Sequence, residues 1–142
     1  MTYCTQAQLE ERYGGEMLKQ LTDRSVPKLG VIDADVVNRA LADADAEIDG
    51  YLAVRYALPL SSTPPLLTDI ALRVAIYKLH AKVMQDKIKA DYELARADLL
   101  RIAKGDIVLQ VAGVQPAAGG SADVRVTDSA KDMSRETMKG FI

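Results

Sequence analysis

The amino-acid sequence predicts a mainly α-helical protein: a bundle of three long helices with short N-terminal helices packed on it, then one or two short β-strands and an extended C-terminal arm. Three observations lead to this prediction. Apolar residues recur at helical spacing from the start of the chain to about residue 105. Residues 106–112 (DIVLQVA) are rich in β-branched side chains and are followed by Gly113, which is typical of a strand. Residues 113–142 hold four of the nine glycines and include the spacer-like run PAAGGSA.

The N-terminal region predicts two short helices. Thr5 followed by Gln8 has the pattern of a capping box, in which two side chains satisfy backbone amides at the start of a helix. The first helix should cover residues 7–13 and end at Gly14, because glycine tolerates the backbone geometry found past a helix end. A second short helix is expected over residues 16–22, followed by a loop that contains proline and glycine.

Three long helices are predicted next. Asp33 is a good N-cap for the first, which must end before Pro59 because a proline ring disfavours helical geometry in the preceding residue. The second should run from about residue 66 to 83, and its wide apolar face predicts the central helix of the bundle. The third, over about 88–103, should end at Gly105, where a left-handed C-cap is expected.

Composition excludes several classes of protein. A chain of 142 residues with 49% hydrophobic residues suffices for one folded domain, and its single Cys4 rules out an intrachain disulfide. No run reaches the ~20 apolar residues of a membrane span, and no secretion signal is recognised, so we expect a protein made in the cytoplasm without membrane contact. Metal sites and nucleophilic triads draw mostly on His and Cys. Because His80 and Cys4 each stand alone, neither an enzyme nor a cofactor is expected.

Charge is unevenly distributed, although the net charge is only −2. Residues 33–49 contain six acids and one base, whereas residues 73–104 contain eight bases and four acids. Helices of opposite charge can be neighbours within one bundle or faces of adjacent subunits in a ring, and the sequence leaves both alternatives open. The candidate channel or inter-subunit charges are Asp43, Asp45, Glu47, Lys78, Lys82, Lys87 and Lys89.

Neither half of this charge pattern predicts a specific ligand. The alternating acids over 43–49 fail the calcium-loop template in both registers, and helical residues two apart diverge, so a solvent-exposed or interface face is favoured. The basic residues are interleaved with acids at intrahelical spacing, which favours a solvated face over a surface that grips nucleic acid. Weak, non-specific contact with DNA in a channel stays compatible with them.

Three stretches together resemble the Mu-like phage head-tail connector (adaptor) family: YCTQAQLEERYG at 3–14, LKQLTD at 18–23 and AEIDGYLAVRYALPLSSTPPLL at 46–67. The resemblance covers about residues 1–110. It implies a non-enzymatic virion protein at the head-tail interface that forms a ring, dodecameric in the wider group of adaptors. Its implied partners are further copies of itself, the portal protein and a downstream neck or tail-completion protein. The alternative is a small helical DNA-binding oligomer involved in packaging or regulation, although no helix-turn-helix pattern is found.

The chain is accordingly divided into a helical connector domain, 1–112, and an extended C-terminal interaction arm, 113–142. We expect the arm to be disordered in the free subunit and ordered in the assembly, by strand addition or by apolar anchors on adjacent chains. The predicted partner-binding residues of the arm are Val124, Val126, Met133, Met138, Phe141 and Ile142. The alternative is that this segment packs on its own bundle as a terminal strand and helix.

Overall fold

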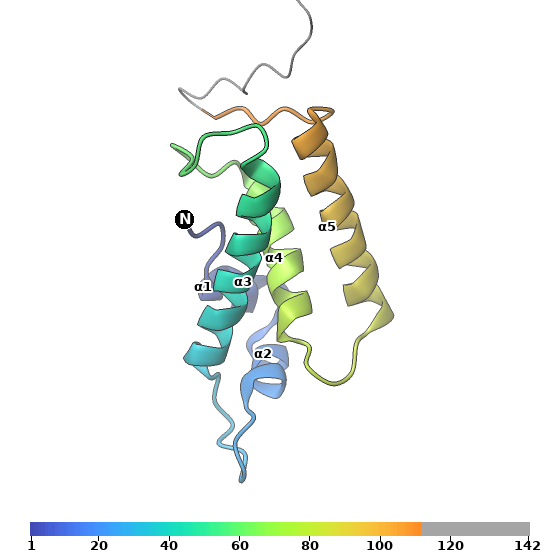
Figure 1. Cartoon of the computed structure of the whole chain (residues 1–142). Helices are drawn as coiled ribbons and strands as arrows, with labels where there is room; N and C mark the ends of the chain where they lie inside the picture. The colour runs from blue at the N-terminus through green and yellow to red at the C-terminus, as the bar shows by residue number, and fades with distance from the viewer. Residues whose placement is uncertain (112–142) are drawn as a thin grey trace, which may run out of the picture.

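The structure, a computed structural model, describes residues 1–111 and contains five helices there (Figure 1). In chain order they are α1 (Gln6–Tyr13), α2 (Gly15–Thr22), α3 (Ala34–Leu52), α4 (Pro65–Leu79) and α5 (Asp86–Lys104). The predicted mainly α class is confirmed.

A three-helix bundle of α3, α4 and α5 forms the body of the molecule (Figure 1). α4 packs against both other helices and is buried on most of its circumference, which explains its wide apolar face. α1 lies against α4, and α2 lies against α3. The largest fully buried side chains come from all five helices: Leu9, Leu18, Val37, Ile48, Leu52, Leu67, Ile70, Val74, Ile76, Leu79, Leu99 and Ile102.

The helix ends follow the capping signals of the sequence. The Thr5 hydroxyl accepts the Gln8 backbone N–H at 3.3 Å, and the Gln8 side chain accepts the Thr5 backbone N–H at 2.9 Å, so the capping box is confirmed. The Asp33 carboxylate caps α3 by accepting two backbone N–H groups, at 3.0 and 3.3 Å. Gly105 ends α5 in the left-handed conformation with φ of 88°. These local signals need no tertiary contact to operate.

Two of the predicted helix boundaries differ in the structure, the end of α4 and the start of α5. α4 ends at Leu79 rather than at residue 83, because Leu79 is its last buried residue and Val83 is 79% exposed. Residues 80–85 form the connection, and Nδ1 of His80 lies 2.7 Å from the carbonyl oxygen of Ile76. α5 begins two residues earlier than predicted, at Asp86.

The strand predicted over residues 106–112 does not form over the part that the structure describes, residues 106–111. The alternation that predicted it is present, since Leu109 and Val111 are buried while Val108 is 55% exposed. The side chains of Leu109 and Val111 pack on the end of the bundle. Within residues 1–111, no other strand is present to pair with the backbone of residues 106–111. The residues assigned to the C-terminal arm, Val124, Val126, Met133, Met138, Phe141 and Ile142, lie outside the described residues.

Candidate interaction surfaces

The acidic run of α3 holds the N-terminal segment against the bundle. The Asp45 carboxylate accepts the Tyr3 backbone N–H at 3.0 Å, and the Asp49 carboxylate accepts the Tyr3 hydroxyl proton. Tyr3 and Cys4 are each only 2% exposed. Asp45 and Asp49 are thus half-buried and bind a segment of their own chain, while a role of Asp45 at a channel or between subunits stays a prediction. Residues four apart share one side of a helix, so the Asp45 and Asp49 carboxylates point the same way. Residues two apart, such as Asp45 and Glu47, point in different directions.

Burial at this contact shifts the titration of the groups that it covers. Burial is the largest cause of the raised pKa of Tyr3, and the hydrogen bond to Asp49 raises it further. Burial also raises the pKa of Cys4 to about 12, with a smaller contribution from the Asp45 carboxylate. The Cys4 thiol therefore stays protonated at neutral pH, and its side chain acts as a small apolar residue of the core.

Glu47 joins all three long helices. Its carboxylate lies 2.8 Å from Nζ of Lys78 on α4, accepts the Tyr92 hydroxyl of α5 at 2.9 Å, and lies 4.0 Å from Nε of Arg96. The Tyr92 ring stacks on Tyr77 with ring centroids 3.8 Å apart. Burial, followed by the hydrogen bond that the Tyr92 hydroxyl donates to Glu47, raises the pKa of Tyr92 to about 12.

This network pairs two of the candidate channel or inter-subunit charges inside the bundle. Glu47 and Lys78 bind each other across α3 and α4, and a role of either at a channel or between subunits stays a prediction. Of the five remaining candidates, Asp45 binds Tyr3, and the other four face solvent: Asp43, Lys82, Lys87 and Lys89. The role of these four at a channel or between subunits stays a prediction.

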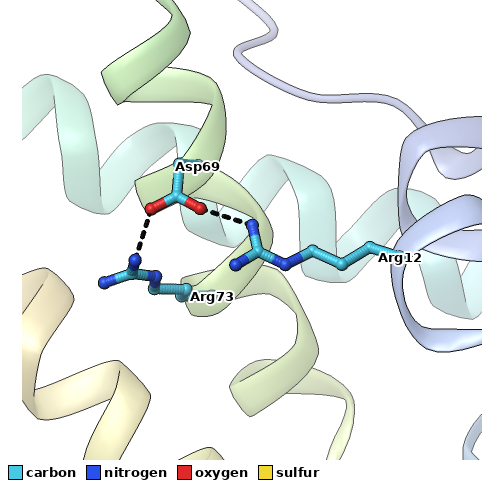
Figure 2. A network of polar contacts seen from close by, with 3 residues as sticks. All are labelled: Arg12, Asp69 and Arg73. Atoms are coloured by element: carbon cyan, nitrogen blue, oxygen red, sulfur yellow. Dashed lines mark hydrogen bonds and ion pairs between the residues drawn. The ribbon is translucent and has the colours of Figure 1, made fainter.

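Asp69 fastens α1 to α4, as Figure 2 shows. One carboxylate oxygen pairs with the Arg12 guanidinium of α1, and the other lies 2.6 Å from Nη2 of Arg73, one turn farther along α4. The three side chains are between 25% and 37% exposed, so solvent screens the pairs and each contributes only about 0–1 kcal/mol. The cluster sets the position of α1 more than it adds stability.

Arg55 and Tyr56, which lie in the stretch that resembles the connector family, hold the segment that follows α5. Nη1 of Arg55 donates to the carbonyl oxygen of Lys104 at 3.3 Å. A Cβ added at Gly105 would lie 2.4 Å from the same nitrogen, so only glycine lets the guanidinium approach there. The Tyr56 hydroxyl accepts the backbone N–H of Leu109 at 2.9 Å. The pair thus joins the end of α3 to the end of α5.

The loop between α2 and α3 has a hydrogen-bonded base and exposed apolar side chains. The Asp23 carboxylate accepts the Ser25 hydroxyl proton and the Gly30 backbone N–H, the latter at 2.7 Å, and these bonds lower the pKa of Asp23. Three aliphatic side chains project from this loop: Val26, Leu29 and Val31, at 98%, 70% and 55% exposed. Sequence reasoning missed them, because a short aliphatic loop carries no periodic signal that separates an exposed residue from a buried one.

A second missed surface lies on α5. Leu94 and Leu100 are 58% and 45% exposed, on the side away from the buried stripe of Ile88, Ala95, Leu99 and Ile102. In the sequence, the only sign of their exposure was that both leucines fall outside the helical spacing of the buried stripe. Over residues 1–111, no three His, Cys, Asp or Glu side chains come together as a metal site. No helix in the same range is long and apolar enough to cross a membrane.

Comparison with known proteins gives one family and two full-length relatives. The sequence matches the model of the family described as "Bacteriophage Mu, Gp36" over residues 3–128. The Mu-like prophage FluMu protein gp36 of Haemophilus influenzae is 30% identical over 140 residues, which cover 99% of this chain and 98% of that protein. Gene product J of Escherichia phage Mu is 34% identical over 142 residues, the whole of both chains. The similarity thus continues past residue 110, where the sequence motifs ended.

Proposed function

From the premise that this chain belongs to the Bacteriophage Mu gp36 family of phage proteins, we propose that it is a structural subunit of the head-tail connector. The subunit forms a ring below the portal and joins the DNA-filled head to the neck and tail. The match to Mu-like phage proteins along nearly the whole chain carries the proposal.

The polar groups of the bundle support a structural role. Asp45 and Asp49 fix the N-terminal segment, Glu47 joins the three long helices, and Asp69 fastens α1. Each of these carboxylates binds an element of its own chain, which suits a protein whose task is to keep its shape within an assembly. The apolar side chains that remain exposed on α5 and on the loop between α2 and α3 are available for contacts with other chains.

The proposed partners are further copies of this chain, twelve in the complete ring, together with the portal above and a neck or tail-completion protein below. The C-terminal arm takes part in these contacts. Non-specific contact with channel DNA is provided by exposed lysines, since a channel requires weak attraction rather than tight binding.

A stop codon in the reading frame of a Mu-like prophage tests the proposal. After induction, electron microscopy should show DNA-filled heads and complete tails that stay separate, and the full chain supplied in trans should restore joined particles. A tag on the restored protein should label the junction between head and tail. Joined particles without the protein, or label found only along the tail, would show that the connector assignment is wrong.

A DNA-binding oligomer is the second candidate, and the exposure of Lys82, Lys87 and Lys89 favours it. Three cations on one stretch can neutralise phosphates, and such binding weakens steeply with salt. Gel-shift titration of the purified full chain at several salt concentrations separates the two functions. Tight binding at moderate salt would favour the DNA-binding oligomer, whereas weak binding that disappears with added salt fits the connector.

A further inference from the structure

The outer face of α5 carries a short apolar strip without a partner in the described part of the chain. Ala90, Leu94 and Ala97 are exposed and follow one another at helical spacing, whereas the exposed Leu100, six residues from Leu94, lies about 120° away around the helix. Leu94 lies two residues from both Tyr92 and Arg96, which contact Glu47 of α3, so it projects about 200° away from that contact. This face therefore cannot be covered by α3 of its own chain.

The outer face of α3 carries small residues. Ala42, Ala46 and Gly50 are exposed and lie one turn apart, and a Cβ added at Gly50 would meet nothing within 4 Å. Small residues give the larger side chains of another helix room to pack, and they allow a close approach of the two axes. α3 and α5 both have 19 residues, so the two faces match in length. Figure 1 shows α3 and α5 as the two flanks of the bundle.

The charges around the two faces are also complementary. Five bases and two acids are exposed along α5: Lys87, Lys89, Arg96, Arg101 and Lys104, with Asp86 and Glu93. The exposed charges of α3 and its N-cap are three acids and one base: Asp33, Asp35 and Asp43, with Arg39. The basic charges around Leu94 on one flank and the acidic charges around the small residues on the other would attract each other and set the register.

We propose that these two faces meet between copies of this chain: Leu94, flanked by Ala90 and Ala97, on α5 of one copy packs against the small residues Ala42, Ala46 and Gly50 on α3 of the next. The proposal rests on the connector function and specifies how its ring is built. Because the two faces differ, the contact is heterologous, and each copy keeps one free face for the next. A contact of this type can build a ring when the rotation from copy to copy closes, and otherwise an open filament, whereas a self-complementary patch stops at a dimer.

Charge introduction and rescue in the full chain test the proposal. Leu94→Glu places an acid against the acidic flank and should raise the dissociation constant for self-association at least about 30-fold, the scale of a central interface residue. Ala46→Lys in the same chain should recover most of that loss, because every copy then presents both changed faces. Val83→Glu is the matched control, since Val83 is 79% exposed but lies on neither face. Sedimentation velocity over a range of concentrations measures association, and melting temperatures confirm that each variant is folded.

A cysteine pair gives a second measurement. Under oxidation, the Leu94→Cys, Ala46→Cys double variant should form a ladder of covalent multimers, whereas each single variant should give no product larger than a dimer. The native Cys4 is buried and does not interfere.

The outcomes separate this interface from the connector function. If Leu94→Glu associates as tightly as Val83→Glu, the interface is wrong, while label at the head-tail junction would leave the connector function standing. If the wild-type chain stays a single copy at every concentration and the double variant gives no ladder, the interface is also overturned. If α5 instead binds only a different virion protein, self-association will be absent although the protein enters particles, and this result too rejects the proposal.

Discussion

Tyr56→Phe tests whether one hydrogen bond holds the segment after α5 to the bundle. The Tyr56 hydroxyl accepts the Leu109 backbone N–H at 2.9 Å, and the two residues are only 4% and 3% exposed. Phenylalanine keeps the ring but leaves the amide without an acceptor in a site closed to water. A buried donor without a partner costs about 1–3 kcal/mol. In a domain of this size each kcal/mol corresponds to about 3 °C, so we expect the melting temperature to fall by about 3–9 °C.

Urea unfolding followed by circular dichroism gives the change in unfolding free energy, and hydrogen exchange of the Leu109 amide reports whether the segment opens locally. Tyr77→Phe is the matched control, because it keeps the ring stacked on Tyr92 and removes a hydroxyl for which the described structure shows no hydrogen bond. If Tyr56→Phe unfolds like this control and the Leu109 amide exchanges no faster than in the wild type, the anchoring role of Tyr56 is refuted.

Three further predictions concern backbone geometry, pH and the arm. In a urea titration, Gly105→Ala should lower the unfolding free energy by about 1–2 kcal/mol, because Gly105 has a φ of 88° and the new Cβ would meet Arg55. Gly15→Ala is the control and should be nearly neutral, because open space surrounds Gly15. The free energy of unfolding should fall as pH rises from about 9 towards about 12, because the unfolded chain releases the Cys4 proton near 9.0 while the folded chain retains it to about 12. The stability of Cys4→Ala should decline less steeply over this range. An equal decline would contradict the raised pKa of Cys4. Deletion of residues 114–142 should leave the melting temperature nearly unchanged but weaken incorporation into particles, and a large loss of stability would instead place those residues in the fold.

Local sequence signals predicted the helix ends well, and the reason is that capping uses groups within a few residues of one another. The Thr5 capping box, the Asp33 N-cap and the Gly105 C-cap all lie where the sequence placed them. The end of α4 and the absence of a strand over 106–111 were not predictable in this way. Both depend on whether a suitable surface lies next to the segment, and an apolar pattern looks the same with or without that surface.

The sequence by itself determined the helical class, the buried stripes and the resemblance to a phage connector family, because periodicity and caps are properties of neighbouring residues. Only the tertiary structure decided how the charges are used. Asp45, Glu47 and Asp49 are equivalent acids in one helical run, yet two of them bind Tyr3 and the third binds Lys78 and Tyr92. Acids two residues apart on a helix point in different directions, and the groups that bind them come from distant parts of the chain. Folding therefore separates the charges that brace the bundle from those, such as Asp43 and Lys89, that stay in solvent.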